Sequence, residues 1–256
     1  MTAKTWKLWM TWRAAIYAVV VLAWPGWTVA AAAQGGTLRD WPAVGVIEFQ
    51  VAYSAGGMQV GQARHRWSHE GGHYRMTLTV ETTGLAALIR ELGYTQEAVG
   101  EITPAGLRST RFGVTQKGKE PEMAIFDWDE ARVSIHRGER ERRSAPLAEG
   151  DIDMLSLWHQ LGHGAALPQS LLVVGNKEAR RARVELLEED SMVVVPAGRF
   201  ASRHFRIEAE DGKLDIELWL ARSRHWAPVK VMIDDAKSGR IVLEASSLRV
   251  PSRRTD

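Results

Sequence analysis

The chain of 256 residues contains no cysteine. It therefore has no disulfide framework, no thiolate metal site and no cysteine nucleophile, and no cysteine to which an N-terminal lipid could be attached. With 45% hydrophobic and 25% charged residues, the composition is that of a globular protein and not of a disordered one. The length corresponds to one large domain or two small ones.

The first 33 residues have the order of features found in a secretory signal peptide. They contain no acidic residue, begin with basic residues, continue through an apolar run at 14–24 and end in small residues at 28–33. Signal peptidases require small residues at the cleavage site, which places the cut near Ala33. We therefore predict export to the periplasm and a mature chain of residues 34–256.

An uncleaved inner-membrane anchor is the alternative for this segment. Residues 14–33 are long enough to span a bilayer, which takes about 20 apolar residues. Pro25 and Gly26 would weaken a helix there, and the alanine-rich end is only mildly apolar. Cleavage is thus favoured, and any contact with the membrane is expected through this leader alone.

The charge of the mature chain argues against a nucleic-acid partner. The full chain has 33 Lys and Arg against 31 Asp and Glu, and the leader holds three of the bases and none of the acids. Residues 34–256 therefore carry 30 basic and 31 acidic side chains, a net charge of −1. Electrostatic binding of nucleic acid needs a clustered excess of positive charge, so no such partner is expected.

Alternation of apolar and polar residues predicts a mainly β fold after the leader. Tyr74, Met76, Leu78 and Val80 alternate with polar residues, which places all four on one face of a strand. Similar runs recur along the chain, with turn signals such as Asp211-Gly212 between them. These runs lie at 47–53, 58–68, 94–102, 107–115, 123–128, 132–136, 171–174, 182–188, 192–195, 200–208, 214–221, 229–233 and 240–250.

One helix is predicted, from Asp151 to Leu161. Asp151 or Asp153 is suited to cap its first turn, and Leu155 and Trp158 belong to an apolar stripe at helical spacing. The glycines at 162 and 164 are expected to end it. Two further segments are less regular: 84–92 is apolar and of helix or loop type, and 137–143 is charged and expected to be a solvated loop or a strand extension.

The sequence lacks the alternating helix and strand rhythm of a parallel sheet, and no linker divides it. We therefore predict a single β-rich domain at 34–256. Its fold is expected to be a curved antiparallel sheet, either a β-roll or an open barrel, of about twelve strands with one short helix packed on it.

The segment His69-Glu70-Gly71-Gly72-His73 matches the zinc-protease pattern H-E-x-x-H. That chemistry needs both histidines on one face of a rigid helix, with the Glu beside the metal-bound water. Two central glycines cost a helix about 2 kcal/mol relative to alanine, and the flanking residues alternate with a period of two. We therefore predict a hairpin turn, reject a catalytic metal site and expect no cofactor, while leaving open that His65 joins this pair in binding stray metal.

Other motifs fall short of a catalytic set. Residues 113–120 resemble a phosphate-binding P-loop, but Glu120 replaces the Mg²⁺-binding hydroxyl. His159 and His163 have a spacing used by metal ligands, yet no third ligand is evident, so we interpret them as exposed histidines at a helix C-terminus. No G-x-S-x-G element is present, and no carboxylate pair is singled out. We assign no catalytic residue, and a non-enzyme is favoured without activity being excluded.

Three tryptophans are candidates for a ligand or partner surface: Trp128, Trp158 and Trp219. Trp219 lies between two leucines that we expect to face the core, so its own side chain should face outward or into a groove. Exposed aromatic rings bind sugars and apolar ligands. The alternative is packing under a loop or under the helix, because Trp is usually largely buried.

Several short segments recur in a characteristic order along the chain: 47–53, Gly56-Gly57, Val60-Gly61, 100–107, Phe126-Asp127-Trp128, 153–157, Pro196-Ala197-Gly198, Trp219-Leu220-Ala221 and Pro228-Val229-Lys230. Taken in this order, they resemble the exported bacterial family catalogued as domain of unknown function 3108. The resemblance runs from about Val44 to Leu248 and implies a Gram-negative envelope protein built on a curved antiparallel sheet, with no catalytic residues to carry over. Similar curved sheets occur in periplasmic lipoprotein carriers, which hold acyl chains.

From these observations we predict a non-enzymatic periplasmic protein with a binding or envelope-assembly role. Its ligand would be a lipid, a glycan or another envelope protein. A groove of roughly 300 Å³ or more with apolar walls would favour a lipid or small-molecule carrier. The alternatives are a cell-wall or polysaccharide hydrolase that uses Asp or Glu side chains, and a purely structural interaction protein.

Overall fold

The computed structural model describes residues 40–53, 58–83, 93–163, 169–237 and 239–252. The chain divides into two units, Met1–Ala33 and Gln34–Asp256, and all described residues belong to the second. The predicted leader and the apolar segment at 84–92 lie outside the described residues. Within those residues, no helix has the length and apolar character needed to cross a membrane.

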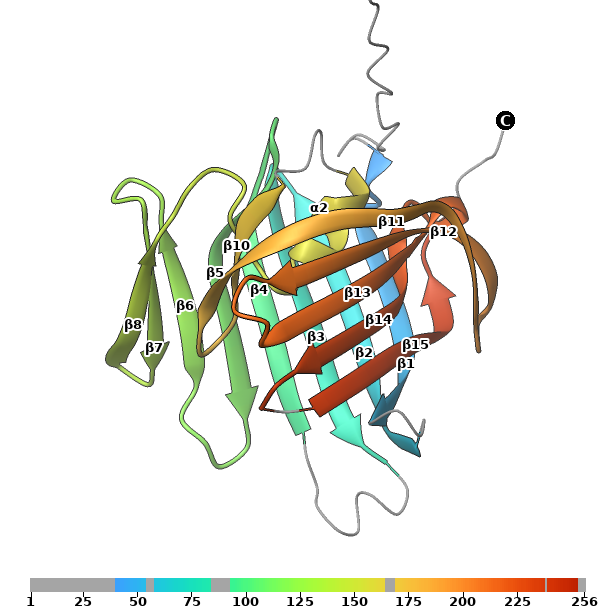
Figure 1. Ribbon diagram of the computed structural model, residues 1–256, viewed down its shortest axis with the longest axis horizontal. Coiled ribbons are helices and arrows are strands. Elements are labelled where there is room, and N and C mark those ends of the chain that lie inside the picture. Colours follow the sequence, from blue (N-terminus) through green and yellow to red (C-terminus); the bar gives the residue numbers. More distant parts are fainter. Residues whose placement is uncertain (1–39, 54–57, 84–92, 164–168, 238, 253–256) are drawn as a thin grey trace, which may run out of the picture. The chain divides into compact units, whose positions relative to one another are not determined.

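In the described part of the chain, fifteen strands form one sheet that does not close on itself, and Figure 1 shows its two halves. The first half begins at β1 in the middle of the sheet and runs strand by strand to β8 at one edge. Its strands are β1 (Val44–Tyr53), β2 (Met58–Glu70), β3 (His73–Thr82), β4 (Gly93–Thr103), β5 (Gly106–Gln116), β6 (Glu122–Asp127), β7 (Arg132–Arg137) and β8 (Arg140–Pro146).

The second half runs from β9 at the opposite edge back to β15, which pairs with β1 and so joins the two halves. All pairings are antiparallel except the short parallel pairing of β9 with β10. The strands of this half are β9 (Ile152–Asp153), β10 (Ser170–Val174), β11 (Ala179–Val195), β12 (Gly198–Ala209), β13 (Leu214–Ala221), β14 (Ala227–Asp235) and β15 (Gly239–Arg249).

The prediction of a mainly β, single, open antiparallel sheet is confirmed, and one short α-helix accompanies it among the residues that the structure describes. The sheet has fifteen strands, more than the predicted twelve or so. The charged residues at 137–143 fall largely in β8, an edge strand whose side chains are mostly exposed and which therefore lacks an apolar alternation. In contrast, the predicted strands 182–188 and 192–195 merge into β11, which two register shifts interrupt.

The helix begins and ends later than predicted: α2 spans Leu157–His163. Residues 152–153 instead form β9, and the Asp153 carboxylate accepts hydrogen bonds from the backbone N–H groups of Leu155 (2.9 Å) and Ser156 (2.8 Å), which fixes the turn before the helix. Asp151 is not a cap, because its carboxylate accepts hydrogen bonds from the backbone N–H groups of Ala148 and Leu172, both at 2.7 Å.

Gly162 lies inside α2 and does not end it; Gly164, the other predicted terminator, lies outside the described residues. A Cβ at position 162 would lie 2.6 Å from Cβ of Trp226. Glycine is therefore required for close packing of α2 against the start of β14 and not for a left-handed turn. A short 3₁₀-helix, η2 (Arg222–Arg224), precedes that strand.

The core lies between the two halves of the sheet, with α2 inside it. Side chains at alternate positions point inward in β1, β3, β7 and β13, as the sequence predicted. α2 contacts both β5 and β14, so each half of the sheet packs on the helix. The largest fully buried side chains come from both halves and from the helix region: Phe49, Met76, Phe112, Ile207, Ile216, Leu218, Leu155, Leu157 and Trp158.

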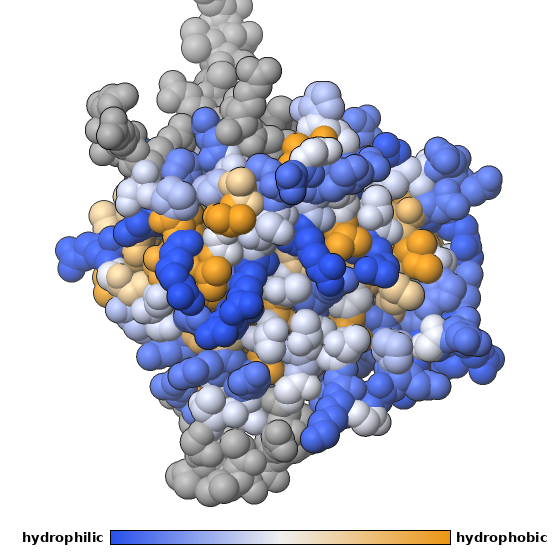
Figure 2. Space-filling view, turned by 180° about the vertical axis from the view of Figure 1, so that it is seen from behind, coloured by the Kyte–Doolittle hydropathy of each residue, from blue (hydrophilic) through white to orange (hydrophobic). Residues whose placement is uncertain are grey.

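The outer surface is mainly polar. Figure 2, which views the molecule from behind, shows hydrophilic residues over most of that face and several small, separate hydrophobic areas. This is the pattern expected of a sheet that buries one face and exposes the other to solvent.

Candidate functional site

The H-E-x-x-H segment is a hairpin turn, as the sequence predicted. β2 ends at Glu70 and β3 begins at His73, and the two glycines between them have left-handed φ angles of 57° and 83°. Glu70 pairs with His73 and His69 pairs with Tyr74, so His69 and His73 leave opposite faces of the hairpin. Two histidines on opposite faces of a sheet cannot share one metal ion. In the described ranges, no group of three or more His, Asp and Glu side chains is placed to hold a metal ion.

Two histidines from distant parts of the sequence meet under the helix. His65 Nε2 on β2 lies 2.8 Å from His159 Nε2 on α2. Trp41 Nε1 donates a hydrogen bond to His159 Nδ1 (3.1 Å), and His65 Nδ1 lies 3.0 Å from the carbonyl oxygen of Thr77. The indole nitrogen can only donate, so His159 Nδ1 is an acceptor and His159 Nε2 carries the proton. His65 Nε2 then accepts, and His65 Nδ1 donates to Thr77.

This chain of hydrogen bonds requires both imidazole rings to be neutral. An added proton on either ring would face another N–H group across a contact of about 3 Å. Burial lowers the pKa of His65 to about 4, with the bond to Thr77 acting in the opposite direction. The pKa of His159 is also lowered well below its ordinary value, first by burial and then by the neighbouring His65 and His163.

The prediction that His159 and His163 are exposed at the helix end is wrong. They are 1% and 3% exposed, because α2 is enclosed by the two halves of the sheet. His65 was not identified as a core residue, although the alternation of Ala63, His65 and Trp67 places it on the buried face of β2. This alternation with a period of two is the sequence feature that predicts the burial of His65.

A second part of the network holds β9 to the first half of the sheet. The hydroxyl of Ser109 on β5 donates to the Asp153 carboxylate at 2.5 Å, and Tyr74 Oη lies 2.9 Å from Ser156 Oγ. Burial raises the pKa of Asp153, although several donated hydrogen bonds lower it in part. Burial and the charge of Asp153 raise the pKa of Tyr74.

These polar groups are too deeply buried to meet a substrate from solvent. Tyr74 is 3% exposed, and Ser109, Asp153 and Ser156 are fully buried. Their hydrogen bonds run between β3, β5, β9 and the turn before α2. The network therefore fixes the helix and the β9 edge inside the sheet, and the site of any ligand has to be sought on the outside.

The three candidate tryptophans lie in separate places. Trp158 is 1% exposed in the core, so it forms no part of a surface. Trp128 is half-buried; its Nε1 donates to the carbonyl oxygen of Ser109 (2.7 Å), and the guanidinium carbon of Arg108 lies 4.8 Å from its ring centre. Trp219 faces outward from β13, as its place between two inward leucines predicted. No common surface joins the three.

Trp219 belongs to a polar cluster on the outer face of β12 and β13. Its ring stacks on His204, with centroids 4.0 Å apart and an interplanar angle of 15°. His204 Nε2 lies 2.7 Å from Glu217 Oε2, and the Lys230 ammonium lies 5.4 Å from the Trp219 ring centre. Because neighbouring side chains cover this ring, it is a cross-strand packing element and offers little free aromatic face.

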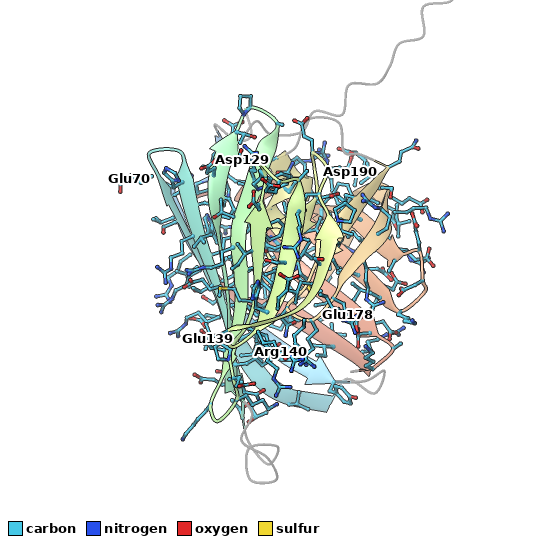
Figure 3. All side chains as sticks on the ribbon, turned by 90° about the vertical axis from the view of Figure 1, so that its left-hand side faces the viewer. Glu70, Asp129, Glu139, Arg140, Glu178 and Asp190 are labelled. Carbon is cyan, nitrogen blue, oxygen red and sulfur yellow. The ribbon has the colours of Figure 1, made fainter. Side chains whose placement is uncertain are left out.

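A cleft of about 660 Å³ opens between the β7–β8 hairpin and the turn that leads into β11. It is lined by seven Lys and Arg side chains against three Glu, a local excess of four positive charges. Figure 3 looks onto this side of the molecule and labels Arg140 on β8 and Glu178 on the facing turn. The lining residues are Lys119, Glu122, Ile135, His136, Arg137, Arg140, Glu141, Arg142, Arg143, Asn176, Lys177, Glu178 and Lys237.

The three carboxylates of this cleft each have a cationic neighbour. Glu178 forms ion pairs with Arg180 and Lys237 and lies 3.7 Å from Arg143. Glu122 lies 3.9 Å from Lys177, and Glu141 pairs with Arg132. The hydrogen bond from Lys237, followed by the charges around it, lowers the pKa of Glu178.

The cleft holds cations that these carboxylates do not neutralise. Within the described part of the chain, Arg140, Arg142 and Lys119 have no carboxylate oxygen within 4.0 Å. The sequence identified residues 137–143 only as a charged stretch, and position 119 only as part of a lysine-rich turn. What the sequence could not predict is that strand pairing brings them to the same hollow as Lys177 and Lys237.

Two smaller clefts are also present, of which the first is mainly polar and the second has a mixed polar and apolar lining. One, of about 210 Å³, lies over the outer faces of β1, β2 and β3 and includes Glu48, Arg64 and Arg66. The other, of about 410 Å³, lies at the ends of β3, β4 and β5 and includes Thr79 and Lys117. Neither has the apolar walls expected for an acyl chain.

Comparison with known proteins gives structural likeness without a function. A β-barrel-like protein of the DUF1849 family from Brucella abortus is similar, with a TM-score of 0.49 and 9% identity over 82% of this chain and 98% of that one. A Bacteroides fragilis protein assigned as exported, with a YmcC-like fold, has a TM-score of 0.35 and 8% identity over 80% and 95% of the two chains. A protein of Parabacteroides distasonis assigned as a lipoprotein has a TM-score of 0.35 and 10% identity over 81% and 96%.

No curated protein matches the chain. One family model matches residues 48–246, which is most of the described unit, and its description is "Protein of unknown function (DUF3108)". The resemblance drawn from the order of short segments in the sequence is thereby confirmed. The chain belongs to the DUF3108 family of proteins of unknown function.

Proposed function

We propose that this protein is a non-catalytic binding protein of the bacterial envelope, which recognises its ligand at the positively charged cleft between β8 and the turn before β11. The observation that carries this proposal is the cleft itself: a hollow of about 660 Å³ with four excess positive charges. Ligand-sized hollows with converging polar groups are the usual places of small-molecule recognition.

The interior is a poor place for a ligand, which argues against a carrier that holds acyl chains inside the sheet. α2 occupies the space between the two halves, and Leu157 and Trp158 are at most 1% exposed. The hydrogen bonds of His65, His159 and Asp153 hold the helix region there. A lipid would therefore be recognised by its headgroup on the outside and not by its chains.

The carboxylates of the cleft do not favour the hydrolase alternative. Glycoside hydrolysis needs one carboxyl group with a raised pKa to act as general acid. The pKa of Glu178 is lowered by Lys237 and the charges near it, which keeps the group ionised. Glu122 and Glu141 also lie beside cationic side chains.

Export to the periplasm is part of the proposal. It is supported by the order of basic, apolar and small residues at 1–33. N-terminal sequencing of the protein from a periplasmic fraction tests it: a start at or near residue 34 supports cleavage. An intact leader in the membrane fraction would support the anchor at 14–33.

Native mass spectrometry tests the binding role. The full protein, purified from expressing cells, is incubated with separated envelope fractions: phospholipids, lipopolysaccharide and peptidoglycan fragments. We expect a noncovalent adduct with one fraction, and recovery of that ligand with unchanged mass after prolonged incubation. Recovery of cleaved ligand would overturn the non-catalytic assignment, and absence of an adduct with every fraction would overturn the binding role.

A further inference from the structure

We infer that the cleft between β8 and the turn before β11 binds an anion that carries at least two phosphate groups. The inference rests on the proposed binding role and names its ligand class. A chain whose residues 34–256 carry a net charge of −1 has concentrated four excess positive charges in one hollow. Such a local field attracts anions even though the molecule as a whole does not.

The size of the charge excess indicates more than one phosphate. A phosphate monoester carries about −1.5 to −2 charges at pH 7, so two of them match an excess of four. Of this excess of four, a single carboxylate would leave about three positive charges uncompensated and a single phosphate monoester about two. The three Glu of the cleft do not supply the missing charge, because the excess of four is what remains after they are counted.

The pairing of β7 with β8 provides a second, independent observation. Arg137 lies directly opposite Arg140 in this pairing; the next pair sets His136 against Glu141, and the pair beyond a register shift sets Ile135 against Arg143. Like charges at directly opposite positions destabilise a sheet. Glu120 compensates Arg137 at 3.2 Å, whereas Arg140 has no carboxylate within 4.0 Å among the described residues. An anion bound between the strand and the facing turn would relieve this repulsion.

The residue types favour phosphate over other anions. Four of the seven cations that line the cleft are arginines, and the guanidinium group donates two parallel hydrogen bonds that fit phosphate oxygens. Nucleic acid is disfavoured, because binding of single strands relies on aromatic side chains that stack on bases. Among the described residues that line the cleft, none is Trp, Tyr or Phe.

Matched phosphate probes test the ligand class. Isothermal titration calorimetry with the full protein compares tripolyphosphate with orthophosphate. Flotation assays compare phosphatidylcholine vesicles that contain lipid A, which has two phosphates, with vesicles that contain its monophosphoryl form. We expect tripolyphosphate to bind at least tenfold more tightly than orthophosphate. Retention by the lipid A vesicles would identify a membrane headgroup as the source, and binding of tripolyphosphate alone would identify a free phosphorylated ligand.

A pair of double variants tests the site. Arg140→Gln with Arg142→Gln removes two charges from the cleft, and Arg66→Gln with Arg183→Gln removes two from exposed positions outside it. We expect the first to weaken tripolyphosphate binding at least tenfold and to flatten its salt dependence, and the second to change the affinity less than twofold. The affected arginines are exposed, so equal melting temperatures are expected and serve as the control for folding.

The outcomes separate this inference from the proposed function. Equal affinity of the two double variants, or equal affinity for orthophosphate and tripolyphosphate, would overturn the phosphate site. If an envelope adduct nevertheless survives in the Arg140→Gln, Arg142→Gln variant, the binding role stands and its ligand lies elsewhere. If the wild-type protein binds neither the phosphate probes nor any envelope fraction, the proposed function fails as well.

Discussion

Mild acid is expected to destabilise the protein through the two histidines under α2. Both rings must be neutral for the chain from Trp41 through His159 and His65 to Thr77 to hold. In the unfolded chain, each histidine has its ordinary pKa near 6.5. The native pKa values are lower, so the unfolded state binds more protons than the native state between about pH 6.5 and pH 4. Stability is therefore full above pH 6.5 and falls as the pH drops through this window.

The size of this effect follows from the pKa of His65. With a native value of about 4 and an ordinary value of 6.5, the linkage relation gives a loss of about 1 kcal/mol between pH 7 and pH 5.5. His159, whose pKa is also strongly lowered, acts in the same direction, so the measured loss should exceed that of His65 alone. The window stops at pH 5.5 because carboxylates in ion pairs begin to take up protons below it.

Guanidinium denaturation at pH 7.0, 6.25 and 5.5 measures the predicted loss. His65→Asn keeps a donor toward Thr77 but removes the titrating ring. This variant should be less stable at pH 7, yet its stability should fall by about 1 kcal/mol less on acidification. His73→Asn, at an exposed position of the β2–β3 turn, is the matched control and should behave as the wild type does. A wild-type stability that stays flat from pH 7 to 5.5, or an unchanged pH dependence in His65→Asn, would refute the argument.

Three further predictions concern Asp153, Gly162 and Trp219, and chemical denaturation measures their effects on stability. Asp153→Ala leaves buried donors of the turn and of β5 without an acceptor and should cost about 3 kcal/mol, whereas Asp153→Asn keeps an acceptor and should cost less. Gly162→Ala should cost about 1–3 kcal/mol because its Cβ would collide with Trp226, and Gly113→Ala, whose nearest neighbour would lie 3.5 Å away, should cost less than 1 kcal/mol. Trp219→Ala should cost about 1 kcal/mol and leave phosphate binding unchanged; a weaker affinity would move the ligand site to β13.

The alternation of apolar and polar residues was enough to predict most of the sheet, because a strand with one buried face shows this pattern within its own sequence. It left residues 137–143 open between a solvated loop and a strand extension, because β8 is an edge strand whose exposed side chains include three arginines and form no apolar face. It also misplaced the start of the helix. Ile152 is apolar at a position that fits either element, and only the pairing of β9 with β10, which lies beyond local sequence, decides the outcome.

The candidate site was harder to predict than the fold. His65 was within reach, since it shares the buried face of β2 with Trp67. The cleft could not be predicted from the sequence, because the order of the strands in the sheet brings together residues as far apart as Lys119 and Lys237. The mature sequence has no net positive charge, so its composition does not indicate that seven Lys and Arg side chains meet at one cleft.

The pairing of β1 with β15 places an early strand of the chain beside its last one. The side-chain hydroxyl of Ser246 donates to the carbonyl oxygen of Glu48, 198 positions away in the sequence. Until the C-terminal strand arrives, β1 exposes an unpaired edge, and the two halves cannot enclose their shared interior. Folding should accordingly be slow, and it can be completed only once the last strand of the chain is present. Loss of the final strand by truncation or proteolysis would leave an adhesive edge prone to aggregation.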